Sequence, residues 1–427
     1  MKSKPVQRME DELGWLQMGL ERLSQRPSDL ADLNRTVLEA SIENNRTILH
    51  CIEEGLPFIS SIYCYAPEIY TAMNLPWYSF YGTRQTMSPP AIIQMDVEGC
   101  DSLDLPSDLC TAIRLAAYYV EADLCPPPTA AIAMITPCDG LQMLQQMVMT
   151  NEKWKNVPMF GPDPPYMEGE RALDYYLTEY RQMVDFLKEH TGRRLNVDRL
   201  REVIEESNKQ YELWAEYNEL RRALPCPHGY SMGVQAFNMV QMLLPGDPRC
   251  TSWLRQLVNN AEQRVREKRG SVDNERIRLL WNDVRPFWIN AFAGWLEREW
   301  GAVIVMDMYT YNPYTLIDTS TEESMFRGLA KRGLYDAPMV RQERGTADEF
   351  INDIVRIVRD YSIDCVVWPG HMGHKAMAAE VGIGREVCRD LGVPFLELSM
   401  DLFDSRYTTP DEIKGRISQF FVAMDLG

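Results

Sequence analysis

Apolar residues recur at helical spacing through the first 55 residues of the chain. Leu13, Leu16 and Leu20 are three or four positions apart, and a second series with similar spacing follows after Asn34. Because residues three and four apart share one face of a helix, the pattern predicts two or three amphipathic helices. Arg26-Pro27 is expected to interrupt them, since proline ends a helix. Residues 1–55 are therefore predicted to form an N-terminal helical segment.

From Leu56 the pattern changes to short apolar runs that alternate with helical stretches, which is typical of parallel βα units. The strand-like runs in this part are LPFISSIY, PWYSFYG, AAIAMIT and the segment from Asn156 to Phe160. Helices are predicted in PEIYTAMNL, in SDLCTAIRLAAYYVEADL with Ser107 as its N-cap, and in LQMLQQMVM. Residues 56–190 are therefore predicted to form a first α/β domain.

A charged helical region leads into a second block of the same kind. Residues 191–272 combine an apolar stripe with Glu- and Arg-rich faces, which predicts a helical connector. Strand-like runs then return as RIRLLWNDV, GAVIVMDMY, CVVWPG and VPFLELSMD. Helices are expected at PFWINAFAGWLEREW, DEFINDIVRIVRDYSI, HKAMAAEVGIGREVCRDL and residues 410–424, with a loop before DEFIN. Residues 273–427 are thus predicted to form a second α/β domain.

Composition and charge disfavour several classes of protein. The chain has 62 acidic and 44 basic residues and a net charge of −18, which argues against nonspecific binding to nucleic acid or an anionic membrane. No stretch approaches the roughly 18 unbroken apolar residues of a membrane span, and the first residues lack an apolar signal core. Ten cysteines in 427 residues are too dilute for a disulfide scaffold. We therefore expect a cytoplasmic protein with reduced thiols.

Soft and acid–base side chains fall where predicted strands end and helices begin. Cys138 follows a buried strand in TPCDG, Cys110 lies in the first turn of its helix, and His371 and His374 follow CVVWPG. In open parallel sheets, ligands bind at this carboxyl edge. Because a helix N-terminus stabilises negative charge, both cysteines are expected to ionise readily and to act as metal ligands or nucleophiles. The alternative is that they are ordinary buried side chains.

The remaining motifs are weaker. The His-x-x-His pair in GHMGHK has ligands for zinc but lacks the glutamate of a metalloprotease helix, so loop histidines bonded to the backbone are the alternative. The sequence contains no Walker-type phosphate loop and no Gly-x-Ser-x-Gly elbow. It therefore offers no nucleotide site of its own and no support for a serine hydrolase.

Several of these segments together resemble the 2-hydroxyacyl-CoA dehydratase/benzoyl-CoA reductase family, from about residue 56 to the C-terminus. YAPEIYTAMNLP is similar to the family's Pro/Glu helix start, with Asn74 where glycine is usual. The contexts of the family's first two ligand cysteines resemble DLCTAIRLAA and TPCDGLQML. The start of its second domain resembles LLWNDVRPFW and GAVIVMDMY. The most specific match is ELSMDLFDSRYTTPDEIKGRISQFF, which resembles the family's terminal motif.

The resemblance implies two flavodoxin-like (Rossmann-like) domains that hold an iron–sulfur cluster, usually [4Fe-4S], between them. It also implies a heterodimer with a homologous second subunit and a separate ATP-hydrolysing iron–sulfur activator that supplies a low-potential electron. Family dehydratases use the electron to form a ketyl radical and eliminate water from a hydroxyacyl-CoA, and family reductases dearomatise an aryl-CoA ring. An oxygen-sensitive enzyme of an anaerobe is therefore expected, and the lack of a phosphate loop in the sequence suits an external ATPase.

The resemblance assigns Cys110 and Cys138 as metal ligands, but the family's third ligand cysteine has no counterpart. Met372 occupies about that place, flanked by His371. Because histidine can replace cysteine on iron, the expected ligands are Cys110, Cys138 and His371, with His371 also expected to take part in catalysis. Two further cysteines are alternative ligands: Cys365 and Cys64. In the remaining alternative the chain binds no cluster and completes the CoA pocket and the interface of a metal-bearing partner.

Three further residues match positions of the family. Glu68, at the helix start of PEIYTAMNL, aligns with a carboxylate near the family's active site and is expected to move a proton. The alternative is an acidic residue that only stabilises the helix dipole. Asp401 and Arg416 match the terminal motif and are interpreted mainly as structural, with a contact to a CoA phosphate as a further role for Arg416.

Overall fold

The computed structural model describes most of the chain, namely residues 2–25, 28–79, 89–133, 138–288, 292–344 and 347–426. In these residues the strands form two four-stranded parallel sheets, with the orders β2-β1-β3-β4 and β6-β5-β7-β8. Numbered within each sheet, both orders read 2-1-3-4, which is the flavodoxin-like arrangement. The predicted α/β class with two flavodoxin-like domains is confirmed.

The first sheet has short strands at positions that the apolar runs predicted. Its strands are β1 (Ile59–Ser60), β2 (Trp77–Tyr78), β3 (Ala130–Ile132) and β4 (Met159–Phe160). Its helices are α3 (Pro67–Ala72), α5 (Pro90–Gly99), α6 (Thr111–Glu121) and α7 (Asp139–Thr150), with a 3₁₀ turn at Cys100–Leu103. The ends of the predicted runs PWYSFYG and AAIAMIT lie outside the described residues.

The second sheet has longer strands, and the first two in chain order, β5 and β6, are buried along their whole length. Its strands are β5 (Ile277–Trp281), β6 (Ala302–Asp307), β7 (Cys365–His371) and β8 (Phe395–Met400). Helices α12 (Phe292–Trp300), α15 (Ala347–Asp360), α16 (Lys375–Leu391) and α17 (Pro410–Ala423) accompany them. Because helices cover both faces of a parallel sheet, its inner strands are apolar on both sides, which is why these runs were recognisable in the sequence.

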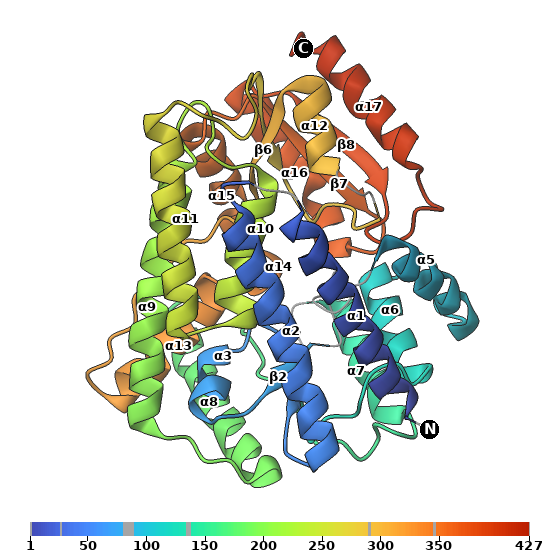
Figure 1. Ribbon diagram of the computed structural model, residues 1–427, viewed down its shortest axis with the longest axis vertical. Helices are drawn as coiled ribbons and strands as arrows, with labels where there is room; N and C mark the ends of the chain where they lie inside the picture. Colours follow the sequence, from blue (N-terminus) through green and yellow to red (C-terminus); the bar gives the residue numbers. More distant parts are fainter. Residues whose placement is uncertain are drawn as a thin grey trace.

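Long helices make up the rest of the molecule. They are α1 (Lys4–Ser24), α2 (Ala31–Glu54), α8 (Glu170–Thr191), α9 (Val197–Leu220), α10 (Tyr230–Phe237), a π-helical turn (Asn238–Leu243) and α11 (Pro248–Arg266). In Figure 1, α1 and α2 cross the front of the molecule between α9 and α11 on one side and α5, α6 and α7 on the other. Arg26-Pro27, expected to break the N-terminal helices, lies outside the described residues.

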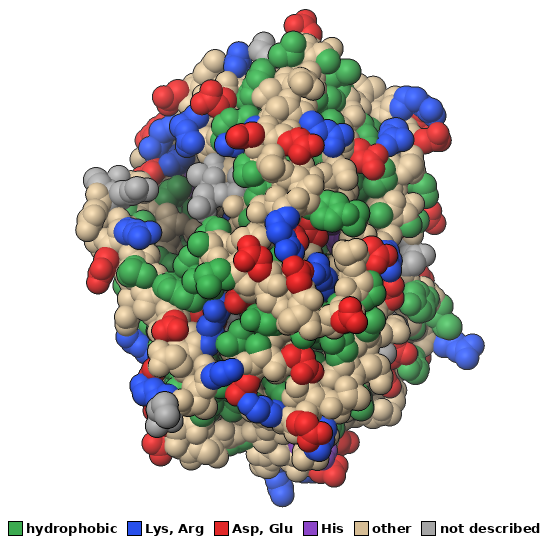
Figure 2. Space-filling model, turned by 90° about the vertical axis from the view of Figure 1, so that its right-hand side faces the viewer, with side chains coloured by type: hydrophobic (Ala, Val, Ile, Leu, Met, Phe, Trp, Pro, Cys, Tyr) green, Lys and Arg blue, Asp and Glu red, His purple; other side chains and the backbone are tan. Residues whose placement is uncertain are grey.

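One core connects the first sheet with these long helices. It contains buried side chains from α2, β1, α6, α9 and α11. The second sheet has a separate core on each of its faces. The predicted division at residues 55, 190 and 272 stays a prediction. On the face in Figure 2, acidic and basic side chains are interspersed. In the described part of the chain, no helix is long and apolar enough to cross a membrane.

Two details of the predicted elements are wrong. Helix α6 begins at Thr111 with Cys110 as its N-cap, and not at Ser107, because residues before it form a turn closed by the Leu109 N–H and the Pro106 carbonyl. The stretch expected to be a loop before DEFIN contains α13 (Glu322–Tyr335) and α14 (Pro338–Glu343). A capping box between Thr321 and Ser324 starts α13 and satisfies its first N–H groups.

A buried carboxylate lies at the C-terminal end of α13. Asp336 accepts hydrogen bonds from the Thr315 backbone N–H at 2.6 Å and from the Thr315 hydroxyl at 3.3 Å. Burial raises the pKa of Asp336 to about 6, although the Arg332 guanidinium and the Thr315 donors oppose the rise. The folded state therefore binds this proton more tightly than the unfolded chain does.

We predict that the unfolding free energy of Asp336→Asn increases relative to that of the parent chain as the pH rises. Between about pH 4 and 6 the parent loses up to about 3 kcal/mol as the buried carboxyl ionises, because its folded pKa lies above its unfolded one. The amide of the variant has no proton to lose, so the difference in unfolding free energy should grow across this window and stay constant above it. Denaturant titrations from pH 4 to 8 measure it. Glu152→Gln, at an exposed position, is the control and should show no such trend.

Candidate functional site

A cavity of about 340 Å³ lies where the carboxyl ends of both sheets meet. The first domain contributes Cys110 and Cys138 to its lining, and the second contributes His371, His374 and Asp401. In doubly wound sheets, ligands bind outside the carboxyl ends of the strands, where the strand order reverses. In the second sheet this reversal lies between β5 and β7, and residues that follow both strands line the cavity. The topology therefore explains the position of the cavity.

Three helices begin at the cavity. Cys110 is the N-cap of α6, Cys138 is the N-cap of α7, and His374 is the N-cap of α16. The N-terminus of a helix carries a partial positive charge and unpaired N–H groups, so each of the three stabilises negative charge in its vicinity. The cavity is consequently suited to thiolates and to an anionic occupant.

Gly373 brings the two domains into direct contact. A Cβ atom on this residue would lie 2.2 Å from both the Cα and the N atom of Cys110. Real Cβ atoms do not approach backbone so closely, so only glycine lets the loop after β7 lie against the start of α6. A second link joins the same helix start to the loop after β8, where the Thr111 hydroxyl donates to Asp401 Oδ2 at 2.5 Å.

His371 is held in one tautomer by the backbone. Its Nε2 lies 2.9 Å from the carbonyl oxygen of Val284, and because a carbonyl only accepts, Nε2 carries the proton and donates it. In the neutral ring, Nδ1 therefore keeps the lone pair. The residue is 4% exposed, and Nδ1 has no hydrogen-bond partner among the described residues. A buried nitrogen with a lone pair and no partner is a ready metal ligand.

His374 is oriented by a buried carboxylate. Its Nδ1 lies 3.1 Å from Oδ2 of Asp283, which is 2% exposed. Burial opposes charge on Asp283, but the imidazoles of His374 and His371 and the Val284 N–H lower the pKa of this carboxyl below its ordinary value. Asp283 is therefore a charged acceptor, and Nδ1 of His374 donates to it.

The two thiols at the cavity differ from the other cysteines. All ten cysteines are described and reduced, and only Cys110 and Cys138 are partly exposed, whereas the other eight are buried. Burial raises the pKa of the Cys110 thiol, and His374 and two backbone N–H groups only partly oppose the rise. The expectation that Cys110 ionises readily is therefore wrong for the protein without a bound cation. A coordinated metal ion removes this penalty, because it deprotonates a thiol ligand outright.

A comparison with protein families supplies the missing context for this arrangement. The family model of the 2-hydroxyglutaryl-CoA dehydratase D-component matches residues 63–422.

The chain belongs to this family. The match covers the second sheet, three of the four strands of the first sheet (β1 precedes it) and every cavity residue named above, so the resemblance to 2-hydroxyacyl-CoA dehydratases is confirmed. At a coarse level the chain is a dehydratase-type subunit from a family that acts on acyl-CoA. A search of the curated proteins found no match.

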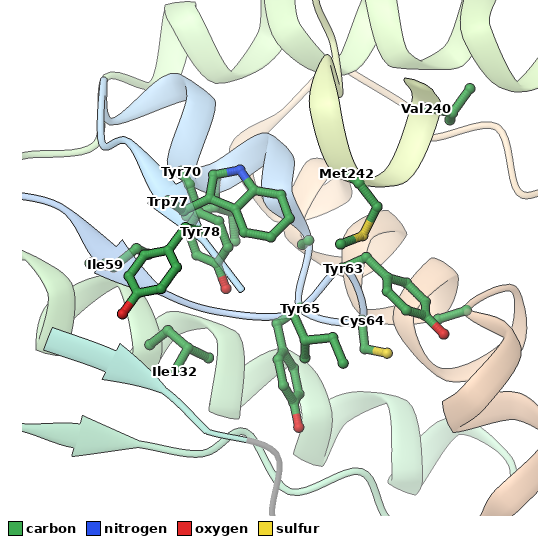
Figure 3. Close-up of a cluster of buried hydrophobic side chains, with 14 of the residues drawn as sticks. Ile59, Tyr63, Cys64, Tyr65, Tyr70, Trp77, Tyr78, Ile132, Val240 and Met242 are labelled. Carbon is green, nitrogen blue, oxygen red and sulfur yellow. The ribbon is translucent and has the colours of Figure 1, made fainter. Parts of the chain in front are cut away.

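The structure does not bring the two alternative cysteine ligands to the cavity of this family member. Cys365 begins β7 and His371 ends it, so about 20 Å of strand separates them. Cys64 lies among buried aromatic side chains, and Figure 3 shows it beside Tyr63 and Tyr65. Met372 contacts the Tyr407 hydroxyl through its sulfur. Among the described residues, no three His, Cys, Asp or Glu side chains converge on one point as the ligands of a single ion do.

Glu68 lies in a second, smaller cavity away from the thiols. Its Oε1 accepts hydrogen bonds from Arg332 at 2.8 Å and from the Ser207 hydroxyl at 2.7 Å. The Arg332 guanidinium also lies 3.9 Å from the ring centroid of Tyr211, which makes a cation–π contact. Glu68 is thus one half of a buried ion pair between α3 and α13.

The two residues from the terminal motif have different surroundings. Asp401 lines the cavity and accepts the N–H groups of Phe403 and Asp404 in addition to the Thr111 hydroxyl. This arrangement accords with its structural interpretation, since it fixes the loop after β8 to α6. Arg416 is exposed on α17 and is not part of the cavity lining. Sequence reasoning assigned no role to Asp283 and Gly373, although they lie in the segments LLWNDVRPFW and GHMGHK.

We predict that Gly373→Ala destabilises the protein by about 1–3 kcal/mol, because the new methyl group overlaps backbone atoms of Cys110 that have no room to move. The matched control is Gly382→Ala on α16, where an added Cβ has nothing within 4 Å. That control should be neutral or up to about 1 kcal/mol more stable, because alanine favours a helix. Urea denaturation of both variants measures the effect, and equal stabilities would contradict the proposed domain contact.

Proposed function

We propose that this chain is the iron–sulfur subunit of an acyl-CoA dehydratase of the 2-hydroxyacyl-CoA type. The observation that supports it is one cavity with two partly exposed thiols, Cys110 and Cys138, and the unpartnered buried Nδ1 of His371. Thiolates and imidazole nitrogens are established ligands of iron–sulfur clusters. We propose these three residues as the ligands of a [4Fe-4S] cluster. When bound, the cluster would supply a one-electron donor and a Lewis acid for a substrate oxygen.

The chain's own residues prepare the cavity for this role. The starts of α6, α7 and α16 stabilise the thiolates and an anionic substrate. Lys375 adds a positive charge to the lining, with Asp108 3.9 Å away. Asp401 and Thr111 hold the edges of the two domains together and so keep the donors at fixed separations. His371 is also proposed to take part in the reaction at the same place.

The remaining machinery is proposed from the resemblance. An ATP-dependent activator would inject the low-potential electron, and a homologous subunit would complete a heterodimer. Oxygen sensitivity and an anaerobic cytoplasm follow from the same proposal. Ring reduction of an aryl-CoA is a second candidate reaction, since it uses the same scaffold. Arg416 is proposed to meet a CoA phosphate, which its exposure on α17 permits.

Glu68 is proposed to move a proton, and its ion pair with Arg332 gives this role a clear test. Arg332→Met is expected to cost about 3–5 kcal/mol of unfolding free energy, because it leaves Glu68 buried without its cation. Glu68→Gln keeps an oxygen that accepts from Ser207 and Arg332, so it should cost less. If Glu68 moves a proton, this conservative variant loses most activity while staying folded. Full activity in folded Glu68→Gln protein would leave the residue a purely structural partner of Arg332.

The cluster itself is tested by iron and acid-labile sulfide analysis of anaerobically purified protein, co-expressed with its partner subunit and separated afterwards. We expect about four irons per chain and a visible spectrum that bleaches in air. Cys138→Ser should lose both iron and activity. The matched control is Cys365→Ser, at the far end of β7, which should keep its iron.

The cluster-free alternative predicts a different result. Iron on the partner subunit only, with a colourless chain that still raises the partner's activity, would make this chain a supporting subunit. Cys138→Ser protein with full iron and activity would refute the ligand assignment.

A further inference from the structure

We infer that a pocket between the first sheet and α7 binds the side chain of the substrate's acyl group and selects a short, uncharged aliphatic one. This inference rests on the proposed acyl-CoA function and names the class of substrate that the site accepts. The pocket has a volume of about 50 Å³, and Ala131, Leu144 and Trp154 are among the residues that line it. We call it the side-chain pocket.

The first support is the position of the side-chain pocket in the first sheet. The strand order β2-β1-β3-β4 reverses between β1 and β3. Ser61 follows β1, Ala133 follows β3, and both residues line the pocket. In doubly wound sheets, ligands bind at this reversal, outside the carboxyl ends of the strands. The first sheet therefore has a pocket at the same topological place as the second sheet.

The second support is the closeness of the side-chain pocket to the thiols. Helix α7 lines both spaces, because Asp139 belongs to the cavity with the thiols and Leu141 belongs to the pocket. Between them is Gly140, where a Cβ atom would lie 3.7 Å from Sγ of Cys138. Since a helix rises about 1.5 Å per residue, Leu141 lies about 4.5 Å along the axis from Cys138. A substrate whose C2 hydroxyl lies near the thiols can therefore extend its side chain into the pocket.

The third support is the chemistry of the lining. Leu141, Leu144 and Val148 are buried and share one face of α7 with Gln145, since they are three or four positions apart. None of the described residues that line the pocket is charged. A carboxylate in the pocket would lose its hydration without gaining a counter-ion, which is costly. An aliphatic group instead gains free energy when it leaves water.

The fourth support is the size of the side-chain pocket. An engineered apolar cavity of about 150 Å³ admits benzene, and the pocket has about a third of that volume. At the same volume per carbon atom, it holds about two carbon atoms and no aromatic ring. The proposed reaction removes the C2 hydroxyl and one C3 hydrogen as water, so atoms beyond C3 take no part in it. A 2-hydroxypentanoyl chain has two such carbon atoms and matches the pocket.

The experiment is isothermal titration calorimetry of CoA esters with the anaerobically purified complex of this chain and its partner subunit, without the activator, so that no turnover occurs. The acyl chains of 2-hydroxypentanoyl-CoA and 2-hydroxyglutaryl-CoA have the same length, but the second ends in a carboxylate. The parent should bind 2-hydroxypentanoyl-CoA at least about 10-fold more tightly than 2-hydroxyglutaryl-CoA or 3-phenyllactyl-CoA. Glycolyl-CoA, which has the hydroxyl and no side chain, is the reference ligand.

Three variants on α7 test whether the preference arises in this pocket. Gln145→Arg replaces a residue whose Oε1 accepts no hydrogen bond among the described residues, and it adds a cation to the lining. It should reverse the preference and favour 2-hydroxyglutaryl-CoA at least about 10-fold. The matched control is Gln146→Arg, at the next and exposed position, which should keep the parent's preference. Val148→Ala enlarges the pocket and should bind 3-phenyllactyl-CoA about 10-fold more tightly than the parent does. All three should bind glycolyl-CoA as the parent does.

Equal affinities of the parent for 2-hydroxypentanoyl-CoA and 2-hydroxyglutaryl-CoA would overturn the inference, and this comparison needs no variant. An unchanged preference in folded Gln145→Arg protein, or unchanged binding of 3-phenyllactyl-CoA in Val148→Ala protein, would also overturn it. If no CoA ester binds, glycolyl-CoA included, the proposed acyl-CoA function itself is refuted. The two failures are therefore distinguishable.

Discussion

The arrangement of the cavity depends on how closely the loop after β7 lies against the start of α6. Gly373 has no Cβ, and this lets its loop rest on the backbone of Cys110. The hydrogen bond from Thr111 to Asp401 adds a second link to the same helix start. Together the two contacts hold the carboxyl edges of both sheets face to face. Thiols from one domain and imidazoles from the other therefore line one space, although each domain alone supplies only one kind of donor.

Much of this frame was predictable because parallel sheets leave a strong trace in a sequence. Buried strands read as continuous apolar runs, and the carboxyl-edge rule located both cysteines and both histidines from the order of residues alone. Helix α13 was missed, and it contains two glycines, Gly328 and Gly333, which have a low helix propensity. Gly333 is a close-packing position, where a Cβ would lie 2.3 Å from the hydroxyl of Tyr180 on α8. Tertiary packing, which a local pattern does not contain, overrides the low helix propensity of glycine there.

The parts that sequence could not supply are pairings between distant residues. Glu68 and Arg332 are 264 positions apart, and the ion pair depends on α13, the helix that the pattern did not reveal. Asp283 meets His374 only because β5 and β7 are neighbours in the sheet. The same limit applies to Cys110, where the helix dipole favours the thiolate but burial outweighs it. Whether the pKa of this thiol rises or falls depends on how deeply the fold buries it, and the spacing of residues in the sequence does not reveal that burial.

The charges of the ligands, of the helix N-termini and of Asp283 affect the chemistry of the proposed site. Each neutral imidazole in place of a thiolate removes one negative charge from the ligands, and three helix starts add partial positive charge around the same cavity. Both effects would stabilise the reduced form of the proposed cluster, which would carry one more negative charge than the oxidised form. The negative charge of buried Asp283, which orients His374, would oppose them. In the proposed function, a net stabilisation of the reduced cluster would favour acceptance of an electron from the activator. It would also make the transfer of that electron from the cluster to the substrate the harder step.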